Sequence, residues 1–283
     1  MEGMKVWKLL WYCLYMCDKL KNQQQLGEEM GRIIHSLNEE KAISFLSSFC
    51  KTMVREWGGL DKWRLDKFYH LSHSLLKEAF LFLQARNWSP DLLSKFLDCL
   101  TRDKEDGPLH PQFDKCLTLK LDISQNYFPL LLQVSSLSLP STLSYSTLHL
   151  LLQPFFTLLS KERLENVKER MCEHLFEPLF ALVDSKPESD AFPPKGVEID
   201  LNKLVQTFAE MAISAQTRES NRKLIYQLRD KFNHLLEEKT GKKTDFSVFL
   251  LHDTPHVEIN ERKRKVEKRG TKELREKLNK RKK

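Results

Sequence analysis

Two histidines one helical turn apart have the types and spacing best suited to metal chemistry in this 283-residue sequence. His70 and His73, with Asp66 four residues before His70, lie on one side of a predicted helix. A zinc site would need a third or fourth ligand from elsewhere in the fold, and the sequence identifies none. His252 and His256 form a weaker pair of the same kind. We therefore interpret these side chains as a polar helix surface and predict no metal and no other cofactor, although a metal-dependent enzyme using His70 and His73 is an alternative.

Six cysteines are scattered through the chain without a CxxC pair, at positions 13, 17, 50, 99, 116 and 172. This distribution is typical of a reduced intracellular protein with small buried thiols. Cys13 and Cys17, at one-turn spacing, are accordingly predicted to belong to the core.

Enzyme signatures are missing from the sequence. It has no GxxxxGK[ST] or GxGxxG phosphate loop, no GxSxG nucleophile elbow and no HExxH zinc motif. With only nine glycines, loops that could cradle a phosphate are scarce. We predict a protein that is not an enzyme and that takes no small-molecule substrate.

The C-terminal end carries the positive charge of the chain. Residues 261–283 hold thirteen Lys/Arg and four Asp/Glu, a net charge of +9, so that residues 1–260 account for −2 of the total of +7. Dense positive charge is sufficient for nuclear targeting or for binding RNA phosphates, and the lack of aromatic residues there predicts sequence-independent contact. The alternative is a solvated helix face, because Glu267, Glu273 and Glu276 are interleaved with the bases. The RNA-binding or targeting candidates are Arg262, Lys263, Arg264, Lys265, Lys268, Arg269, Lys280, Arg281, Lys282 and Lys283.

Apolar residues recur with the helical period along most of the chain, and strand-like alternation is missing. Helices are predicted at 4–20, 23–37, 39–57, 60–87, 89–102, 144–159, 162–183, 200–214 and 218–238. Ser89 is the predicted cap of its helix, with Pro90 in the first turn. Between 125 and 154, where Pro129, Pro140 and Pro154 occur, we predict helix broken by a loop. Antiparallel pairs joined by short turns predict an all-α, HEAT/armadillo-like helical repeat, an α-solenoid, with a basic C-terminal tail.

A stretch rich in proline and charge divides the chain. Residues 1–183 are predicted to form a helical-repeat domain, 184–198 a linker, 199–259 a C-terminal helical segment and 260–283 the basic tail.

The run from Val6 to Cys17 is intensely apolar apart from Lys8. It is shorter than the roughly 20 residues that span a bilayer, so no membrane partner is predicted. We interpret it as a helix buried on most sides. If the first repeat lacks a capping element, its apolar face would instead be exposed.

The corner between the helices predicted at 39–57 and 60–87 is rich in tryptophan and charge. Gly58-Gly59 is expected to end the first helix through a left-handed backbone, and Leu60-Asp61 to open the second. Lys62 is spaced to pair with Asp66. Ion pairs that stabilise the corner and a patch that binds a partner are compatible interpretations. The partner-binding candidates are Arg55, Trp57, Asp61, Trp63, Arg64, Asp66 and Lys67.

Three segments carry a family resemblance: WYCLYMCDK from Trp11 to Lys19, TMVREW from Thr52 to Trp57, and LDKWRLDKFY from Leu60 to Tyr69. Together they resemble the ribosomal RNA-processing protein 1 family, whose pattern reads roughly WYCMWMxDK and then TMxREWxGIDRLRLDKYYML. Departures from that pattern are Tyr15, Leu60, Trp63 and Phe68. The resemblance is good over 4–88, weaker to about 183 and faint in 198–236.

The resemblance implies a non-catalytic ribosome biogenesis factor of the nucleus and nucleolus. Such a scaffold would act in assembly of the large-subunit preribosome and in precursor rRNA processing. Its partners would be other pre-ribosomal assembly factors, ribosomal proteins and the phosphates of precursor rRNA. The alternative is a helical-repeat adaptor between proteins in nuclear transport or signalling.

Overall fold

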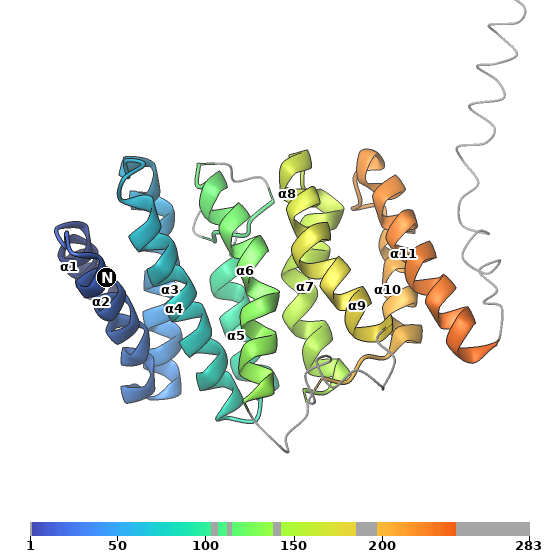
Figure 1. The fold of residues 1–283 in the computed structure, drawn as a ribbon, viewed down its shortest axis with the longest axis horizontal. Coiled ribbons are helices and arrows are strands. Elements are labelled where there is room, and N and C mark those ends of the chain that lie inside the picture. The colour runs from blue at the N-terminus through green and yellow to red at the C-terminus, as the bar shows by residue number, and fades with distance from the viewer. Residues whose placement is uncertain (1, 103–106, 112–114, 138–142, 185–196, 242–283) are drawn as a thin grey trace, which may run out of the picture.

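The structure is a computed structural model that describes residues 2–102, 107–111, 115–137, 143–184 and 197–241. It is a row of antiparallel helix pairs that runs from the α1–α2 pair at one end to α10 and α11 at the other (Figure 1). The elements are α1 (Glu2–Tyr15), α2 (Leu20–Arg32), η1 (Ile33–Ser36), α3 (Glu39–Glu56), η2 (Trp57–Gly59), α4 (Leu65–Gln84), α5 (Pro90–Thr101), α6 (Leu117–Ser136), α7 (Tyr145–Lys161), α8 (Glu165–Met171), η3 (Cys172–Phe176), α9 (Glu177–Asp184), α10 (Leu201–Ile213) and α11 (Glu219–Thr240). The predicted all-α solenoid is confirmed.

The helices form two layers with the core between them. In one layer α1 packs on α3, α3 on α5 and α5 on α7, while in the other α2 packs on α4 and α4 on α6. Aromatic side chains connect the pairs through the core, as where Tyr127 lies between Phe80 and Phe155, with ring centroids 5.0 and 4.7 Å away. Each inner helix therefore has a neighbour on both sides, and α1, at the end of its layer, does not.

Short polar side chains begin several helices as expected. The side chains of Asn38, Ser144 and Asp200 accept hydrogen bonds from the backbone N–H groups three residues later, at the starts of α3, α7 and α10. Pro90 lies in the first turn of α5 as predicted, and Ser89 occupies the cap position, but its hydroxyl makes no capping hydrogen bond. That helix start therefore depends on the fixed backbone angle of proline.

The prediction of a broken helix between 125 and 154 is confirmed, although two of its three prolines do not cause the break. Pro129 and Pro154 lie inside α6 and α7 and do not interrupt them. α6 ends at Ser136 and α7 begins at Tyr145, and Pro140 lies outside the described residues. The start of α6 at Leu117 was not predicted. Tertiary packing of the two helices overrides the helix-breaking tendency of the prolines.

The helices that follow the predicted linker continue the same stack. Phe208 of α10 lies 5.9 Å from Phe156 of α7 and 5.6 Å from Phe232 of α11, measured between ring centroids. Most of the predicted linker, residues 185–196, lies outside the described residues, as do 242–259 of the C-terminal segment. The division into 1–183 and 199–259 stays a prediction.

The first helix is buried on one side only, which corrects the expectation that it would be covered on most sides. Trp7, Trp11 and Leu14 are at most 4% exposed and enter the core. The opposite face presents Val6, Leu9, Tyr12 and Met16, which are 49–72% exposed. Within the described part of the chain, no helix combines the length and apolar character required to cross a bilayer.

Candidate partner-binding surface

Trp57 anchors the tryptophan-rich corner from the inside. Its side chain is 4% exposed, its indole N–H donates to the Thr118 hydroxyl at 2.8 Å, and its ring lies 5.3 Å from that of Tyr69. These contacts tie the end of α3 to α4 and α6. Trp57 therefore holds the corner in place and is not itself available to a partner.

The turn after Trp57 differs from the predicted one. Gly58 and Gly59 form a 3₁₀ turn, and neither has a positive φ angle. A β-carbon at either position would meet open space. The turn is closed by Asp61, whose carboxylate accepts from the backbone N–H groups of Trp63 at 3.0 Å and Arg64 at 3.1 Å. Asp61 thus folds the loop before α4, and the helix itself begins at Leu65.

Arg64 and Lys67 connect this turn to the end of α1. The Arg64 guanidinium pairs with Asp61 and lies 4.3 Å from the centre of the Tyr15 ring. The Lys67 ammonium donates to the carbonyl oxygens of Tyr15 at 2.7 Å and Cys17 at 2.9 Å, which terminate α1. Burial, with the nearby charge of Arg64, lowers the pKa of Lys67. The expected Lys62–Asp66 pair is replaced by the Asp61–Arg64 pair.

The seven candidate residues consequently separate by exposure. Lys67 and Trp57 are buried and serve the fold, while Asp61 and Arg64 are half-exposed and bonded to each other. Arg55, Trp63 and Asp66 are exposed. The structure brings all seven to one corner, but only the half-exposed pair and the three exposed residues can contact another molecule.

Trp63 is the most exposed large hydrophobic side chain among the described residues, at 81%. The Lys62 ammonium lies 4.7 Å from the centre of its ring. Tryptophan is enriched where proteins bind one another, and little at this position requires an indole for packing. We define Arg55, Lys62, Trp63 and Asp66 as the corner patch; Lys62 was not among the predicted candidates.

The histidines on α4 are engaged in the fold. His73 Nε2 lies 2.9 and 3.0 Å from the two carboxylate oxygens of Asp122 on α6, and His70 Nε2 lies 3.2 Å from the carbonyl of Gln24. The described residues contain no group of three or more His, Cys, Asp or Glu side chains arranged to hold a metal. His252 and His256 lie outside the described residues.

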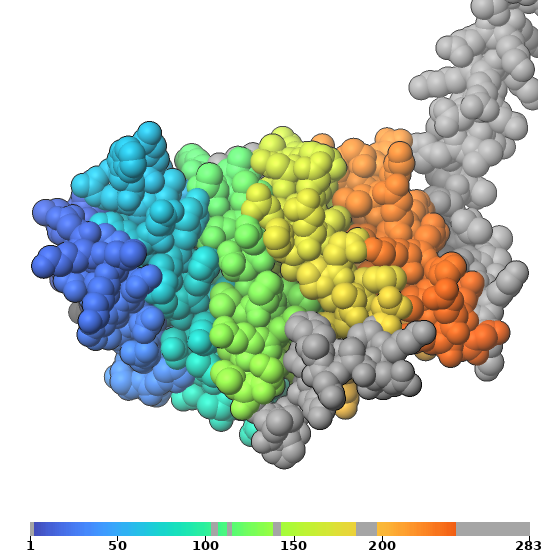
Figure 2. Space-filling model, viewed as in Figure 1, coloured from blue at the N-terminus to red at the C-terminus, as the bar shows by residue number. Residues whose placement is uncertain are grey.

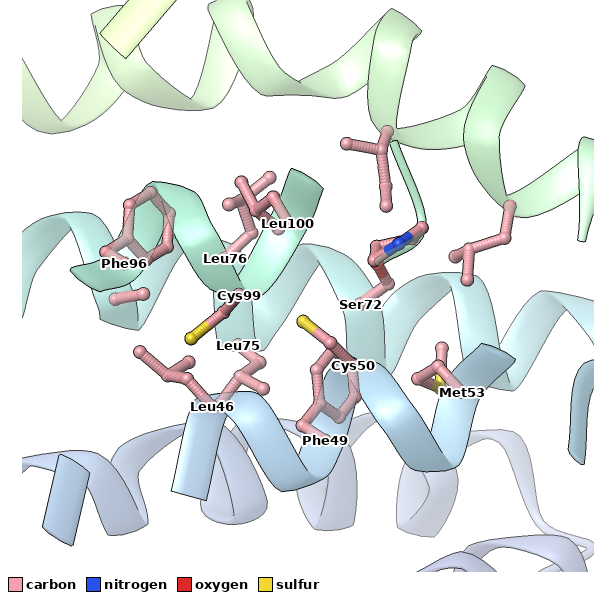
Figure 3. Close-up of a pocket in the computed structure, with 14 residues that line it drawn as sticks. Leu46, Phe49, Cys50, Met53, Ser72, Leu75, Leu76, Phe96, Cys99 and Leu100 are labelled. Atoms are coloured by element: carbon pink, nitrogen blue, oxygen red, sulfur yellow. The ribbon is translucent and has the colours of Figure 1, made fainter. Parts of the chain in front are cut away.

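A small apolar cavity of about 30 Å³ lies between α3, α4, α5 and α6, with Cys50 and Cys99 on its wall (Figure 3). Burial raises the pKa of Cys99 to about 11 and that of Cys50 well above its usual value. Both thiols stay protonated near neutral pH and are therefore poor nucleophiles. Cys116 is also buried. Cys13 and Cys17 were predicted to belong to the core, but Cys13 is exposed, so that prediction was wrong for it, and Cys17 is half-exposed.

The exposed face of α1 was only conditionally foreseen, although the sequence contains its signal. Val6, Leu9, Cys13 and Met16 recur at spacings of three and four, on the side of the helix opposite Trp7. Two apolar faces on one helix mean either burial on both sides or an unpartnered face.

The ten basic tail candidates, from Arg262 to Lys283, lie outside the described residues.

Stacked helix pairs and a surface-exposed tryptophan at the corner define a helical-repeat protein whose surfaces are suited to binding other macromolecules. The family described as nucleolar protein Nop52 matches residues 1–283, and the chain belongs to that family. The family predicted from the three sequence segments is confirmed.

Relatives with curated names agree with this assignment. The chain is 40% identical over 103 residues to Ribosomal RNA processing protein 1 homolog A of Mus musculus, which covers 36% of this chain and 21% of the relative. The human protein of the same name is 38% identical over 111 residues, 39% of this chain and 23% of the relative. Ribosomal RNA processing protein 1 homolog of Dictyostelium discoideum is 25% identical over 250 residues, 81% of this chain and 50% of the relative. These three matches span half or less of each relative's length. They do not favour the adaptor in nuclear transport or signalling.

Proposed function

We propose that this chain is a non-catalytic scaffold of ribosome biogenesis, acting in the nucleolus during assembly of the large-subunit preribosome and processing of precursor rRNA. The observation that carries the proposal is the match of the nucleolar family Nop52 to the whole chain, together with relatives named for ribosomal RNA processing. A solenoid supports a scaffold because its stacked repeats offer long surfaces for binding.

Two surfaces would make the contacts. The corner patch would bind a protein of the precursor particle, either an assembly factor or a ribosomal protein, with Trp63 as the central side chain. The basic tail would add contact with precursor rRNA through phosphates. The first contact depends on shape and apolar burial and the second on charge, so salt affects them differently.

Sedimentation of a nuclear extract on a sucrose gradient tests the function. We expect the tagged chain to migrate with large-subunit precursor rRNA at moderate salt. Trp63→Ala should shift most of the protein to the free fractions. The matched control is Leu137→Ala, which removes another exposed side chain, 66% exposed, at the end of α6. Migration of the unaltered chain only as free protein would overturn the assembly function, and equal loss with both variants would overturn the corner patch.

The tail is tested by RNA binding at several salt concentrations. Removal of residues 261–283 should weaken binding to precursor rRNA and flatten the dependence of affinity on salt, because up to thirteen cations are lost. A variant with the same tail residues in shuffled order should bind as the unaltered chain does. Unchanged affinity for precursor rRNA after truncation would contradict a contact between the tail and RNA phosphates. Loss of binding in the shuffled variant would show that the contact depends on the order of residues in the tail.

A further inference from the structure

Three exposed cations come together where the end of α7 meets the start of α11. Lys161 is the last residue of α7, Arg163 follows it in the turn to α8, and Arg218 directly precedes α11. The backbone N–H of Arg218 donates to the carbonyl oxygen of Ser160 at 3.0 Å, which brings these distant segments side by side. We define Lys161, Arg163 and Arg218 as the junction cluster.

Buried polar groups hold the backbone beneath the junction cluster. The side-chain amide of fully buried Asn221 donates to the carbonyl oxygens of Leu159 at 3.0 Å and Glu162 at 2.8 Å. The carboxylate of Glu162 in turn accepts from the backbone N–H of Arg163 at 2.8 Å. The segments that carry the three cations are therefore fixed relative to each other, so less conformational freedom is lost when they bind one ligand.

The surroundings of the junction cluster remain positive after their carboxylates are counted. Residues 160–170 and 214–223 contain seven Lys/Arg and four Asp/Glu, a net charge of +3. Two of the carboxylates are already paired with lysines, Glu162 with Lys120 at 3.0 Å and Glu165 with Lys168 at 2.6 Å. Within the described part of the chain, the three cations of the junction cluster have no ion-pair partner. An anionic ligand would therefore find unpaired positive charge at this place.

The junction cluster lacks the apolar side chains typical of a protein-binding site. None of the exposed large hydrophobic residues of the described chain lies within 160–170 or 214–223. Binding between proteins concentrates its energy in a few well-packed side chains, among which tryptophan and tyrosine are enriched. Contact with nucleic-acid phosphates requires closely spaced cations and little else, and arginine can bind a phosphate through two N–H groups. The composition of the site therefore favours the backbone of RNA over a protein.

The position of the junction cluster separates it from the basic tail. The turns between α3 and α4, α7 and α8, and α10 and α11 lie along one edge of the row (Figure 1). In the space-filling view, the yellow surface of α8 and the orange surface of the last helix pair adjoin along that edge (Figure 2). α11 runs from this edge to the opposite one, and its 22 residues span about 33 Å. The junction cluster and the end of the described chain are therefore on opposite edges.

We propose that the junction cluster binds the phosphodiester backbone of precursor rRNA, without reading its sequence and separately from the tail. The inference rests on the proposed function for the identity of the RNA, and it makes the folded solenoid itself an RNA-binding surface. The two can fail independently. Binding of purified chain to RNA tests the junction cluster, whereas co-migration with precursor particles tests the function.

The experiment measures binding of the purified full chain to an RNA duplex of about twenty base pairs at several salt concentrations. Lys161→Gln/Arg163→Gln/Arg218→Gln should lower the affinity at least about tenfold at moderate salt. It should also reduce the slope of log affinity against log salt by about two to three, because each phosphate contact contributes nearly one. The three side chains are exposed, so the variant should retain the circular dichroism and melting temperature of the unaltered chain.

A matched control removes the same charge elsewhere. Lys8→Gln/Lys21→Gln/Lys41→Gln changes exposed residues of α1, α2 and α3 and should alter the affinity less than about twofold. Equal losses in the two triple variants would overturn the proposal, because net charge alone would then explain binding. Unchanged affinity in the junction variant would overturn it as well.

A conservative variant and a competitor test the chemistry of the contact. Arg163→Lys/Arg218→Lys retains the charges and should keep most of the affinity, and a loss as large as that of the glutamine variant would contradict binding through charge. A second duplex of unrelated sequence should bind equally well, and a strong preference between the two would contradict backbone contact. If polyglutamate bound the unaltered chain as tightly as the duplex and the glutamine variant lost it, the site would belong to an acidic protein segment instead.

Discussion

The ammonium of Lys120 lies 3.0 Å from the carboxylate of Glu162, and both side chains are fully shielded from solvent. The pair joins α6 to the end of α7. The second carboxylate oxygen of Glu162 accepts from the backbone N–H groups of Arg163 and Leu164, at 2.8 and 3.1 Å, and so helps to start α8. A buried charge with several partners specifies how these helices meet, because other arrangements would leave it unsatisfied.

Glu162→Gln should destabilise the protein by about 3–5 kcal/mol, because it removes one partner of a fully buried ion pair. Urea denaturation at neutral pH measures the change. The matched control is Lys95→Met, which breaks an exposed pair with Asp91 and should cost no more than about 1 kcal/mol. Equal small losses in the two variants would mean that Lys120 finds another partner or water.

Asn221 should be as sensitive to replacement. It is fully buried, its amide N–H₂ donates to the carbonyls of Leu159 at 3.0 Å and Glu162 at 2.8 Å, and its amide oxygen accepts from Lys168 at 3.1 Å. Asn221→Leu leaves these groups unsatisfied, at about 1–3 kcal/mol for each. Hydrogen exchange should rise in α10 and α11 before it rises in α3 and α4.

Asn202→Leu is the control for that experiment, since Asn202 is exposed on α10. It should leave exchange nearly unchanged. A rise of the same size throughout the chain in Asn221→Leu would show that Asn221 acts on global stability and not on the attachment of the last helix pair.

The two tryptophans of the corner should behave in opposite ways. Trp57→Ala removes a buried ring and should cost about 3–5 kcal/mol of stability, and Trp57→Phe should cost about 0.5–1.5 kcal/mol through loss of the hydrogen bond to Thr118. Trp63→Ala should change stability by less than about 0.5 kcal/mol, because its ring is exposed. Thermal and urea unfolding of the three variants would check this, and a large loss of stability in Trp63→Ala would assign it a role inside the fold.

Cys99 makes the stability of the fold depend on pH in the alkaline range. The unfolded thiol loses its proton near the ordinary cysteine pKa of 9.0, whereas burial raises the pKa of the folded thiol to about 11. Between these values the folded chain holds more protons than the unfolded chain, so stability falls as pH rises. The stability difference between the unaltered chain and Cys99→Ala should therefore shrink from pH 9 to pH 11.

Urea titrations at about pH 8, 9.5 and 10.5 would measure that difference on both sides of the unfolded pKa. Leu75 lines the same cavity and has no titrating group, so the loss of stability caused by Leu75→Ala should not vary with pH. A constant difference for Cys99→Ala would contradict the assigned burial of the thiol.

The sequence by itself determined most of the helices, their antiparallel order and the family. Helical periodicity and capping residues such as Asn38 act over a few positions, so they are visible without knowledge of the fold. The three motif segments were sufficient for the family because they are local strings of residues. The end of α3 was placed within one residue for the same reason, while the start of α4 was misplaced because Asp61 closes a loop before the helix.

Only the tertiary structure decided which residues of the same type are buried and which are exposed. Trp57 and Trp63 belong to one corner, yet one enters the core and the other remains in solvent, because distant Thr118 and Tyr69 surround only the first. Lys120 and Glu162 are forty-two positions apart. Of the two apolar faces of α1, one is covered by α3 and α4. Exposure is set by neighbours that the chain brings from far away, and no local pattern specifies them.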